Sequence, residues 1–586
     1  MSLPRSLLDA PLADLDLELR SGAWPDGLGG ELFVSTSERA TAPVHGFFGD
    51  GVMIRLSLAP GTHGAPPGHF AWRQRVIDTP TRRIRRARPD VWHASGIGWS
   101  SPVGFANAAN TAPLPWDGRL FATWDAGRPV EVDPESLRFL GEVGRADSWG
   151  DDPTGAAVLP LIPSTAHPAP DPERGCLWSV RSHPATGEVD VVRWDGDAPT
   201  VRRWPLAGVA LPQSLHTVAQ SRDWLVLIDT AFRVDVAEAL GGAERSVTTF
   251  TDEPAWLVRK DDLEATPDGE PVGPRATLRL TPEVNHHVAA WDDADGLRLL
   301  LEHTPETDLA MALRVDDEDA RGRPVDPRLR GLYTHAMAPG RVDDIVIDPR
   351  TGAVVDRASF ARPDECWAPQ LSAVDWSLPG LCAPAAHHML FTGFRAEAVT
   401  ERALRLYRDR VDRADLPATD LPARMVTLER PGLQPLSSWA FGPDDYPTSP
   451  CLVPRPGGTP GGRDGWVVVP VLNDDGFRVD VFDAGDVGRG PVAVLAAPGA
   501  ATVPFLIHSA WVPAARAAEP RPRLRFADDL DRDQVAALPD DLAAVVRRVA
   551  RELDDDVAAL TSAPAAAPRR EGEAPPPPAE RGTGCP

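Results

Sequence analysis

The sequence predicts an all-β protein made of many short antiparallel strands, with one helix near the C-terminal end. Proline (63) and glycine (49) are spread along all 586 residues, and long segments with helical spacing are few. One kind of corner also recurs, in which Asp-Pro or His-Pro precedes polar residues and an extended run, as in a type I turn between antiparallel strands. The corners are "VDPESLRFLG" from residue 132, "PDPERGCLWSV" from 170, "HPATGEVDVVRW" from 183 and "IDPRTGAVVDRASF" from 347.

Repeated hairpins over about 500 residues suit a β-propeller, in which small antiparallel sheets are arranged around an axis. The turns alone are equally compatible with a large β-sandwich or with two tandem β-domains. Near the N-terminus, "HGFFGDG" at 45–51 runs into the apolar stretch "VMIRLSL". Its three glycines allow backbone angles that other residues avoid, which predicts a tight turn that opens a hairpin.

Only the C-terminal region breaks the β pattern. Apolar residues recur at helical spacing and predict an amphipathic helix packed on the β-domain. Beyond it, the segment "TSAPAAAPRREGEAPPPPAERGTGCP" is rich in Pro and Ala and is expected to be disordered. We therefore expect a β-propeller domain at 1–515, a helical extension at 516–560 and a disordered tail at 561–586. The apolar residues of the helix are Leu542, Val545, Val546, Val549 and Leu553.

Charge and cysteine content exclude several classes of protein. The net charge of −25 argues against a nucleic-acid partner and against adhesion to acidic lipid by charge alone. The five cysteines are scattered, which predicts neither a disulfide framework nor a thiolate zinc site. The first twenty residues carry an acid every few positions, so they resemble neither a signal peptide nor a membrane span. We expect a cytoplasmic protein.

Four of the 14 histidines stand in contexts that suggest a shared site, whereas an isolated histidine is usually a surface or satisfied core residue. Three of the four are followed by a turn or a new strand, as residues at the inner mouth of propeller blades would be. Histidines distant in sequence could therefore meet on the axis. They are His167 in "PSTAHPAPDPERG", His216 in "PQSLHTVAQSRDW", His286 in "EVNHHVAAWDD" and His508 in "ATVPFLIHSAWVP".

Five stretches together resemble the carotenoid cleavage oxygenases, also called the retinal pigment epithelial membrane protein family. They occur in the family's order between about residues 15 and 513: "HGFFGDGVMIRLSL", "GRLFATWDAGRPVEVDPESLRFLG", "TAHPAPDPERG", "CLVPRPGG" followed by "GWVVVPVLNDD", and "VPFLIHSAWVP". The resemblance implies a seven-bladed β-propeller that holds non-haem Fe2+ on four histidines. It also implies that His45 is structural, and we expect the neighbouring phenylalanine pair to pack in the core.

The resemblance carries the metal ligands over position by position. His167, His216 and His508 each match one family ligand. The family pattern H-x-x-N-A-x-E places the remaining ligand four residues before an alanine, which here is Ala290, so it selects His286 and predicts that His287 points away. Four neutral imidazoles around Fe2+ leave two adjacent octahedral positions open, with room for dioxygen. The implied reaction is cleavage of a conjugated C=C bond by a dioxygenase.

The carboxylates that orient the ligand imidazoles in the family are altered here. Three family glutamates accept hydrogen bonds from ligand rings and so fix the tautomer and the ring direction. Asp125 stands in the place of one, and Ser449 in the place of another. Glu365 in "PDECWAPQL" is the candidate for the third. The shorter arm of Asp125 should leave a gap to its imidazole, unless a backbone shift or a bridging water compensates for it.

The substrate class also follows from the resemblance. Family members that cleave stilbenes carry a lysine beside the first orienting glutamate, whereas this chain has Trp124 there and its one lysine is Lys260. A carotenoid, apocarotenoid or similar polyene is therefore expected, so the partners are an apolar small molecule and O2, with peripheral membrane contact at the tunnel mouth left open. Two alternatives stay open: stilbene-type or other alkene cleavage or isomerisation on the same iron site, and a metal-free propeller that serves as a binding scaffold.

Overall fold

The computed structural model describes residues 3–562 apart from short internal stretches, and the tail from residue 563 lies outside the described residues. The predicted disordered tail therefore falls almost wholly outside them. The internal stretches left out are 5–6, 8–9, 43–44, 96–97, 151–157, 184–185, 212, 231, 233–244, 246–251, 282, 295 and 379–380.

Strands from both ends of the β-rich region share one eleven-stranded sheet. β1 (Leu15–Gly22) pairs antiparallel with β33 (Pro491–Ala496), and β2 (Glu31–Ser37) pairs antiparallel with β34 (Leu506–Val512). The two ends of the chain thereby close the architecture and cover each other's strand edges. The other strands of this sheet are β3 (Gly51–Ser57), β4 (His69–Val76), β25 (Val374–Asp375), β29 (Tyr446–Pro447), β30 (Cys451–Pro454), β31 (Gly465–Asn473) and β32 (Gly476–Asp483).

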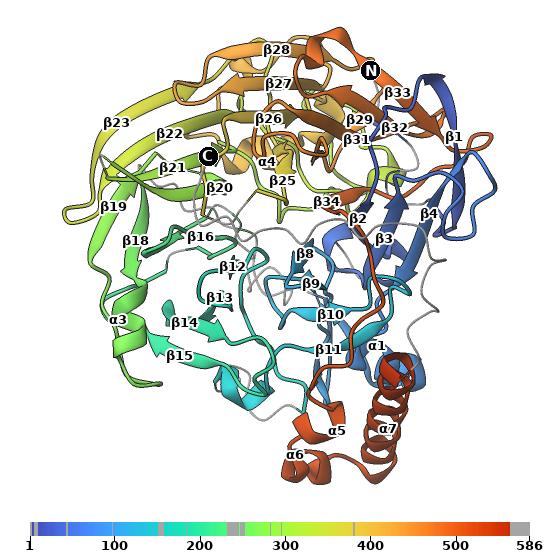
Figure 1. Cartoon of the computed structure of the whole chain (residues 1–586), viewed down its shortest axis with the longest axis vertical. Coiled ribbons are helices and arrows are strands. Elements are labelled where there is room, and N and C mark those ends of the chain that lie inside the picture. Colours follow the sequence, from blue (N-terminus) through green and yellow to red (C-terminus); the bar gives the residue numbers. More distant parts are fainter. Residues whose placement is uncertain are drawn as a thin grey trace.

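Five four-stranded antiparallel sheets complete most of the fold. Figure 1 shows them around a common centre, with the first strand of the sheets that begin at β8, β12, β16 and β20 nearest to it. A three-stranded sheet lies beside them. The strands are β5 (His93–Ser95), β6 (Gly98–Ser101), β7 (Gly104–Phe105); β8 (Ala112–Trp116), β9 (Arg119–Thr123), β10 (Val130–Val132), β11 (Phe139–Glu142); β12 (Ala169–Asp171), β13 (Cys176–His183), β14 (Glu188–Trp194), β15 (Arg202–Pro205); β16 (Val218–Gln220), β17 (Trp224–Ile228), β18 (Glu253–Arg259), β19 (Ala276–Leu280); β20 (Val284–Asp293), β21 (Gly296–His303), β22 (Arg341–Asp348), β23 (Ala353–Phe360); and β24 (Gln370–Ser372), β26 (Ala386–Phe391), β27 (Arg424–Glu429), β28 (Pro435–Ala440).

The predicted all-β class is confirmed, since strands far outweigh helices in the part of the chain that the structure describes. The four predicted corners each join antiparallel neighbours, namely β10 and β11, β12 and β13, β13 and β14, and β22 and β23. The number of blades stays a prediction. Five four-stranded sheets are separate, but the eleven-stranded sheet carries β30–β33 and β1–β4 without a break, so the described residues do not form seven separate four-stranded blades.

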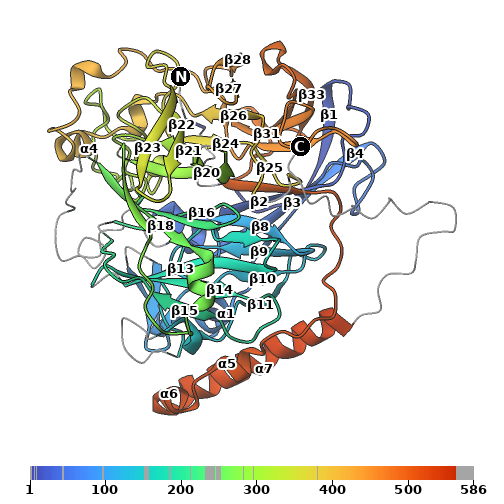
Figure 2. The ribbon, with the colours of Figure 1, turned by 60° about the vertical axis from the view of Figure 1, so that its left-hand side comes forward.

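The predicted helix is α7 (Asp540–Ser562). Leu542, Val546, Val549 and Leu553 are buried in one apolar cluster with residues of β9, β10, β11 and α1, and Val545 packs against that cluster. Figure 2 shows α5, α6 and α7 together outside the sheets of β8–β15. The division into a domain at 1–515 and an extension at 516–560 stays a prediction. The remaining α-helices are α1 (Pro80–Ala87), α3 (Lys260–Ala265), α4 (Glu401–Leu406), α5 (Phe526–Asp529) and α6 (Arg532–Ala537); the 3-10 helices are η1 (Arg39–Thr41), η2 (Gly46–Phe48), η3 (Pro89–Val91), η4 (Ala146–Trp149), η5 (Pro327–Leu329), η6 (Ala396–Ala398), η7 (Arg413–Asp415) and η8 (Val487–Arg489).

Glycine is required in the stretch 45–51 for a different reason from the one predicted. It forms η2 and opens β3, as a turn should, but Gly49 has φ of −81°. Close approach requires the glycines instead. A Cβ on Gly49 would lie 2.4 Å from the Glu38 carbonyl oxygen, and a Cβ on Gly51 would lie 2.1 Å from the Ala109 carbonyl oxygen.

Most of the described cysteines are free. Cys176, Cys366 and Cys451 are free and buried, whereas Cys382 is disulfide-bonded, a bond that the cysteine spacing did not predict. Among the described residues, no helix is both long and apolar enough to cross a membrane.

One buried ion pair ties two neighbouring sheets together. The ammonium group of Lys260 lies 2.7 Å from a carboxylate oxygen of Asp171, and neither side chain is exposed to solvent. Lys260 also donates to the Gln220 side chain at 2.8 Å and to the Ser221 carbonyl oxygen at 2.7 Å, while Trp178 donates to Asp171 at 3.2 Å. All the hydrogen-bonding capacity of the ammonium group is therefore used, which is what permits a charge to be buried here.

We expect Lys260→Met to lower the free energy of unfolding by about 3 kcal/mol, because it removes the buried counter-charge of Asp171 and leaves only the more distant Arg174, 3.6 Å away. Urea denaturation followed by circular dichroism measures the loss. Arg259→Met is the matched control: Arg259 pairs with Asp261 at an exposed site, with 43% and 54% of the side chains exposed, so its effect should stay below about 0.5 kcal/mol. Equal losses in the two variants would contradict the prediction.

Candidate metal centre

Four sheets bring the predicted histidines to the centre of the fold. His167 and His216 each lie two residues before the first strand of their sheet, β12 and β16. The backbone N–H of His167 donates to the His216 carbonyl oxygen at 3.1 Å, and that of Val218 donates to the His167 carbonyl oxygen at 3.1 Å. His286 lies on β20, and His508 lies on β34. The structure therefore brings together all four histidines that the sequence selected.

The four imidazole rings are close neighbours. Ring centroids lie 4.9 Å apart for His167 and His216, 5.1 Å for His167 and His286, and 4.6 Å for His167 and His508. They lie 5.1 Å apart for His216 and His286 and 5.3 Å for His286 and His508. One nitrogen from each of His167, His216 and His286 falls within 4.8 Å of the others. Four ligands of an octahedron with two neighbouring positions open form five adjacent pairs and one opposite pair, and five of the six ring pairs here are adjacent.

The donor set fits a divalent transition metal. Burial lowers the pKa of His508 to about 3, so this imidazole is neutral near pH 7 and keeps a lone pair for a metal. Imidazole nitrogens suit iron, zinc, copper and nickel better than calcium or magnesium. His45 is different, because both of its nitrogens are used within the protein. The Phe47 N–H donates to Nδ1 at 3.1 Å, and Nε2 lies 2.9 Å from the Leu309 carbonyl oxygen, so His45 is structural as expected.

Asp125 contacts a ligand candidate directly, without the predicted gap. Its two carboxylate oxygens lie 2.9 Å and 3.0 Å from His216 Nδ1. Since a carboxylate accepts, Nδ1 carries the ring proton and Nε2 presents its lone pair to the other histidines. The backbone around Asp125 is held as well: the Ser164 N–H donates to its carbonyl oxygen at 2.6 Å, and the Ala166 N–H donates to its carboxylate at 3.2 Å.

Of the other two predicted orienting positions, Ser449 lines a cavity together with one of the histidines, whereas Glu365 pairs with arginines. Glu365 pairs with Arg362 at 3.3 Å and Arg424 at 3.7 Å, and its side chain is 35% exposed, so the structure does not bring it to a histidine. Ser449 is buried, and its hydroxyl group lies 3.4 Å from that of Thr448. It lines a second cavity, of about 300 Å³, together with His508.

Glu302 is a buried carboxylate near the histidines that the sequence reasoning did not consider. It lies on β21 directly across from His286 on β20, and both residues line the second cavity. Its Oε1 lies 3.7 Å from His387 Nε2, and burial raises the pKa of Glu302 to about 8. The side chain of His287 is outside the described residues, so the prediction that it points away stays a prediction.

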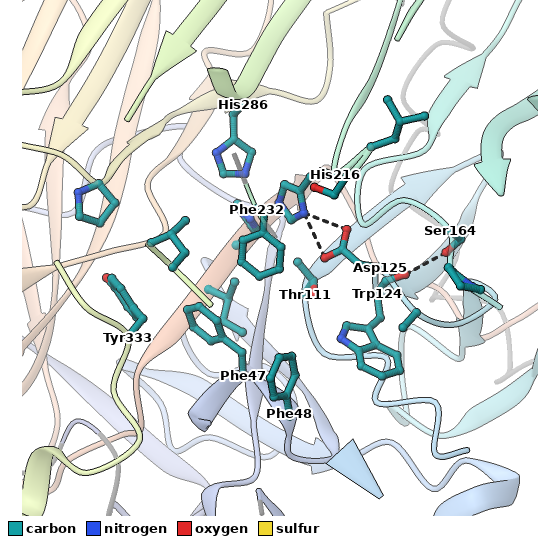
Figure 3. A pocket seen from close by; sticks show the side chains of 18 of the residues that line it. Phe47, Phe48, Thr111, Trp124, Asp125, Ser164, His216, Phe232, His286 and Tyr333 are labelled. Carbon is teal, nitrogen blue, oxygen red and sulfur yellow. Dashed lines mark hydrogen bonds and ion pairs between the residues drawn. The ribbon is translucent and has the colours of Figure 1, made fainter. Parts of the chain in front are cut away.

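An apolar cavity of about 240 Å³ adjoins the histidines (Figure 3). His216, His286 and His508 form part of its wall, and aromatic rings form much of the rest. As expected of the phenylalanine pair, Phe48 is buried in a small apolar cluster with Trp124 and Phe47 packs against it, and both rings also line this cavity. The ring of Phe232 stacks on that of His216 with centroids 5.0 Å apart. Trp124 lines the cavity beside Asp125.

A comparison with protein families places the chain. The family described as retinal pigment epithelial membrane protein matches residues 8–513. The chain belongs to this family. The family match spans the four histidines, Asp125 and the residues that line the apolar cavity, which confirms the resemblance seen in the motifs.

Individual relatives are distant. The chain is 23% identical over 496 residues to the apocarotenoid-15,15'-oxygenase of Synechocystis, covering 80% of this chain and 86% of that protein. It is 29% identical over 152 residues to carotenoid cleavage dioxygenase 7 of Oryza sativa, covering 23% of this chain and 24% of that protein. The aligned part thus spans about a quarter of the rice protein.

Two solved structures have a similar fold. A mutant of the Synechocystis apocarotenoid oxygenase aligns with a TM-score of 0.57 and 18% identity, covering 87% of this chain and 98% of that one. The lignostilbene dioxygenase of Pseudomonas brassicacearum aligns with a TM-score of 0.57 and 17% identity, covering 88% and 100%. At these identities the likeness concerns the fold. Together with the family match, it supports an oxygenase.

We expect Asp125→Ala to lower the affinity for Fe2+ by about ten- to a hundredfold, because His216 loses the carboxylate that fixes its tautomer. Asp125→Glu should also lower it, since the aspartate already reaches the ring and one more methylene would overpack the contact. Competition with a chelator measures the affinity. Glu365→Ala is the control and should leave the affinity unchanged. Unchanged affinity in Asp125→Ala would separate this residue from metal binding.

Proposed function

We propose that the protein is an iron(II)-dependent dioxygenase that cleaves a conjugated C=C bond of a carotenoid, apocarotenoid or similar polyene with O2. The observation that carries the proposal is the convergence of four imidazoles, one of them oriented by a carboxylate, on the wall of an aromatic cavity. Membership of a family that includes oxygenases supports the same reaction class.

His167, His216, His286 and His508 would hold the iron. Bound there, iron(II) would supply the electrons that activate dioxygen. Asp125 keeps the proton of His216 on Nδ1, so that the ring offers Nε2 and cannot rotate away. The four proposed ligands are neutral imidazoles and include no carboxylate. They would therefore leave the positive charge of the metal uncompensated.

The cavity would bind the substrate and exclude water from it. Phe47, Phe48, Phe232 and Trp124 present ring faces and edges on which an extended conjugated chain can lie. One double bond would then rest beside His216, His286 and His508. Cleavage of an alkene requires no side-chain acid or base, so the work of this chain is to hold the substrate in place and keep the site dry.

The substrate assignment rests on the lining of the cavity. Trp124 makes the wall beside Asp125 apolar, and Lys260 is buried in its pair with Asp171, so it has no part in the cavity. An apolar polyene suits such a wall. The Synechocystis relative over most of the chain is named as an apocarotenoid oxygenase, which supports the same class.

A stilbene-type alkene is the second candidate. The cavity volume of about 240 Å³ is small for a ligand pocket, where about 300 to 1,000 Å³ is common. A compact alkene would fill it more completely than a long polyene. A lignostilbene dioxygenase is among the solved structures with a similar fold, and it is covered along its whole length.

We expect His286→Ala to abolish iron binding and His287→Ala to retain most of it, because His286 lies in the histidine cluster and the family pattern selects it over His287. Iron content of protein purified with Fe2+ present measures both. Wild-type protein incubated with an apocarotenal and with a stilbene under labelled oxygen should give labelled carbonyl products from one of them. Equal iron content in the two variants would contradict the ligand assignment, and wild-type protein free of iron would favour the metal-free scaffold.

A further inference from the structure

Three polar side chains form a hydrogen-bonded chain at the wall of the apolar cavity. The hydroxyl oxygens of Tyr333 and Tyr446 lie 2.7 Å apart, and the Tyr446 hydroxyl lies 3.4 Å from His335 Nε2. All three residues are buried. The two tyrosines line the cavity, and His335 stacks behind Tyr333 with ring centroids 5.1 Å apart. Phe47, which also lines the cavity, stacks on Tyr333 with ring centroids 5.2 Å apart.

The three side chains carry one more proton than the two hydrogen bonds between them require. Burial lowers the pKa of His335 to about 3, so the imidazole is neutral and carries a single N–H. Two phenol protons and this N–H make three donors, while the chain of three groups contains only two hydrogen bonds. One proton must therefore point out of this group, from Nδ1 of His335, from the hydroxyl group of Tyr333, or from that of Tyr446 if Tyr446 accepts from both neighbours.

The two ends of the chain are not equivalent. Nδ1 of His335 is buried and makes no hydrogen bond with any residue that the structure describes, so a proton there would be buried without an acceptor. A buried N–H without an acceptor is rarer and more costly than a nitrogen lone pair without a donor. With the proton on Nε2, His335 donates to Tyr446, and a head-to-tail order, in which each hydrogen bond strengthens the next, has Tyr446 donate to Tyr333. The proton of Tyr333 is then left for the cavity.

Two other hydroxyl groups on the cavity wall have acceptors in the protein. Ser164 donates to the carbonyl oxygens of Trp124 at 3.0 Å and Gly127 at 2.7 Å, and Thr448 donates to that of Leu506 at 2.8 Å. These groups have no proton to offer a ligand. The proton of Tyr333 differs because the hydrogen bonds behind it direct it into the cavity.

We propose that Tyr333 determines substrate specificity by donating a hydrogen bond to an acceptor oxygen, whether carbonyl, hydroxyl or ether, at one end of an otherwise apolar substrate. The inference rests on the proposed function, whose site it deepens. Figure 3 shows Tyr333 apart from Asp125, with Phe47 and Phe232 between them. The oxygen would therefore bind away from Asp125, while the conjugated chain extends toward the histidines.

The test compares two probes, an apocarotenal and the hydrocarbon that lacks only its aldehyde oxygen. Wild-type protein with iron bound should bind the aldehyde more tightly, as followed by quenching of tryptophan fluorescence. Tyr333→Phe removes the proton and keeps the ring, so it should raise the dissociation constant and KM for the aldehyde about tenfold. Values for the hydrocarbon and kcat for either probe should change little.

Tyr407→Phe is the matched control, since Tyr407 is buried in a separate apolar cluster with Trp367 and Phe394. It should leave binding of both probes unchanged. An equal loss for aldehyde and hydrocarbon in Tyr333→Phe would show a structural role and overturn the inference, as would wild-type protein that does not distinguish the probes. If neither probe is cleaved although the aldehyde binds selectively, the proposed reaction fails while the binding inference holds.

Discussion

The pairing of β2 with β34 is the constraint on which the candidate metal centre depends. Three of its histidines come from sheets that follow one another along the chain, but His508 comes from the far end. Val34 pairs with Ser509 and Leu32 with Trp511 across this junction, and the His508 N–H donates to the Ser35 hydroxyl at 3.3 Å. Apolar residues on both strands are buried in one core cluster. The entropy of closing a loop of nearly 500 residues rises only slowly with its length, so a modest set of pairings can hold the fourth ring in place.

Asp125 shows that an aspartate can contact a ligand imidazole at a position where the family has the longer glutamate. Its carboxylate contacts His216 directly and accepts from the Ala166 N–H, and its carbonyl oxygen accepts from the Ser164 N–H, so both hydrogen bonds tie it to the segment that leads to His167. One acid therefore links two of the four histidine segments. A gap or a compensated contact was expected for the shorter arm, and the structure shows a direct contact.

Motifs that carry backbone requirements could be predicted from the sequence. The Asp-Pro corners specify turns, and the strands they join pair as expected. The four histidines were found because each stands in a longer stretch similar to the family. The glycines at 49 and 51 were predicted to be needed, but for the wrong reason: they admit nearby carbonyl oxygens, and only contacts between distant segments reveal that. The same holds for Phe47 and Phe48, whose apolar character suits a core and a cavity wall equally.

Glu302 shows why the surroundings of the histidines could not be predicted as well as the histidines themselves. Counting back along β20 and β21 from the pair Asp293 and Gly296 would place His303 opposite His286. Irregular pairing between His287 and Ala289 moves the register by one residue, so Glu302 takes that place. Since neighbouring residues of a strand face opposite sides of a sheet, this single shift decides whether a carboxylate or an imidazole faces the same side as His286. The sequence alone shows neither the bulge nor its effect on the opposite strand. For this reason the sequence pointed to the partly exposed Glu365 and not to the buried Glu302 beside His286.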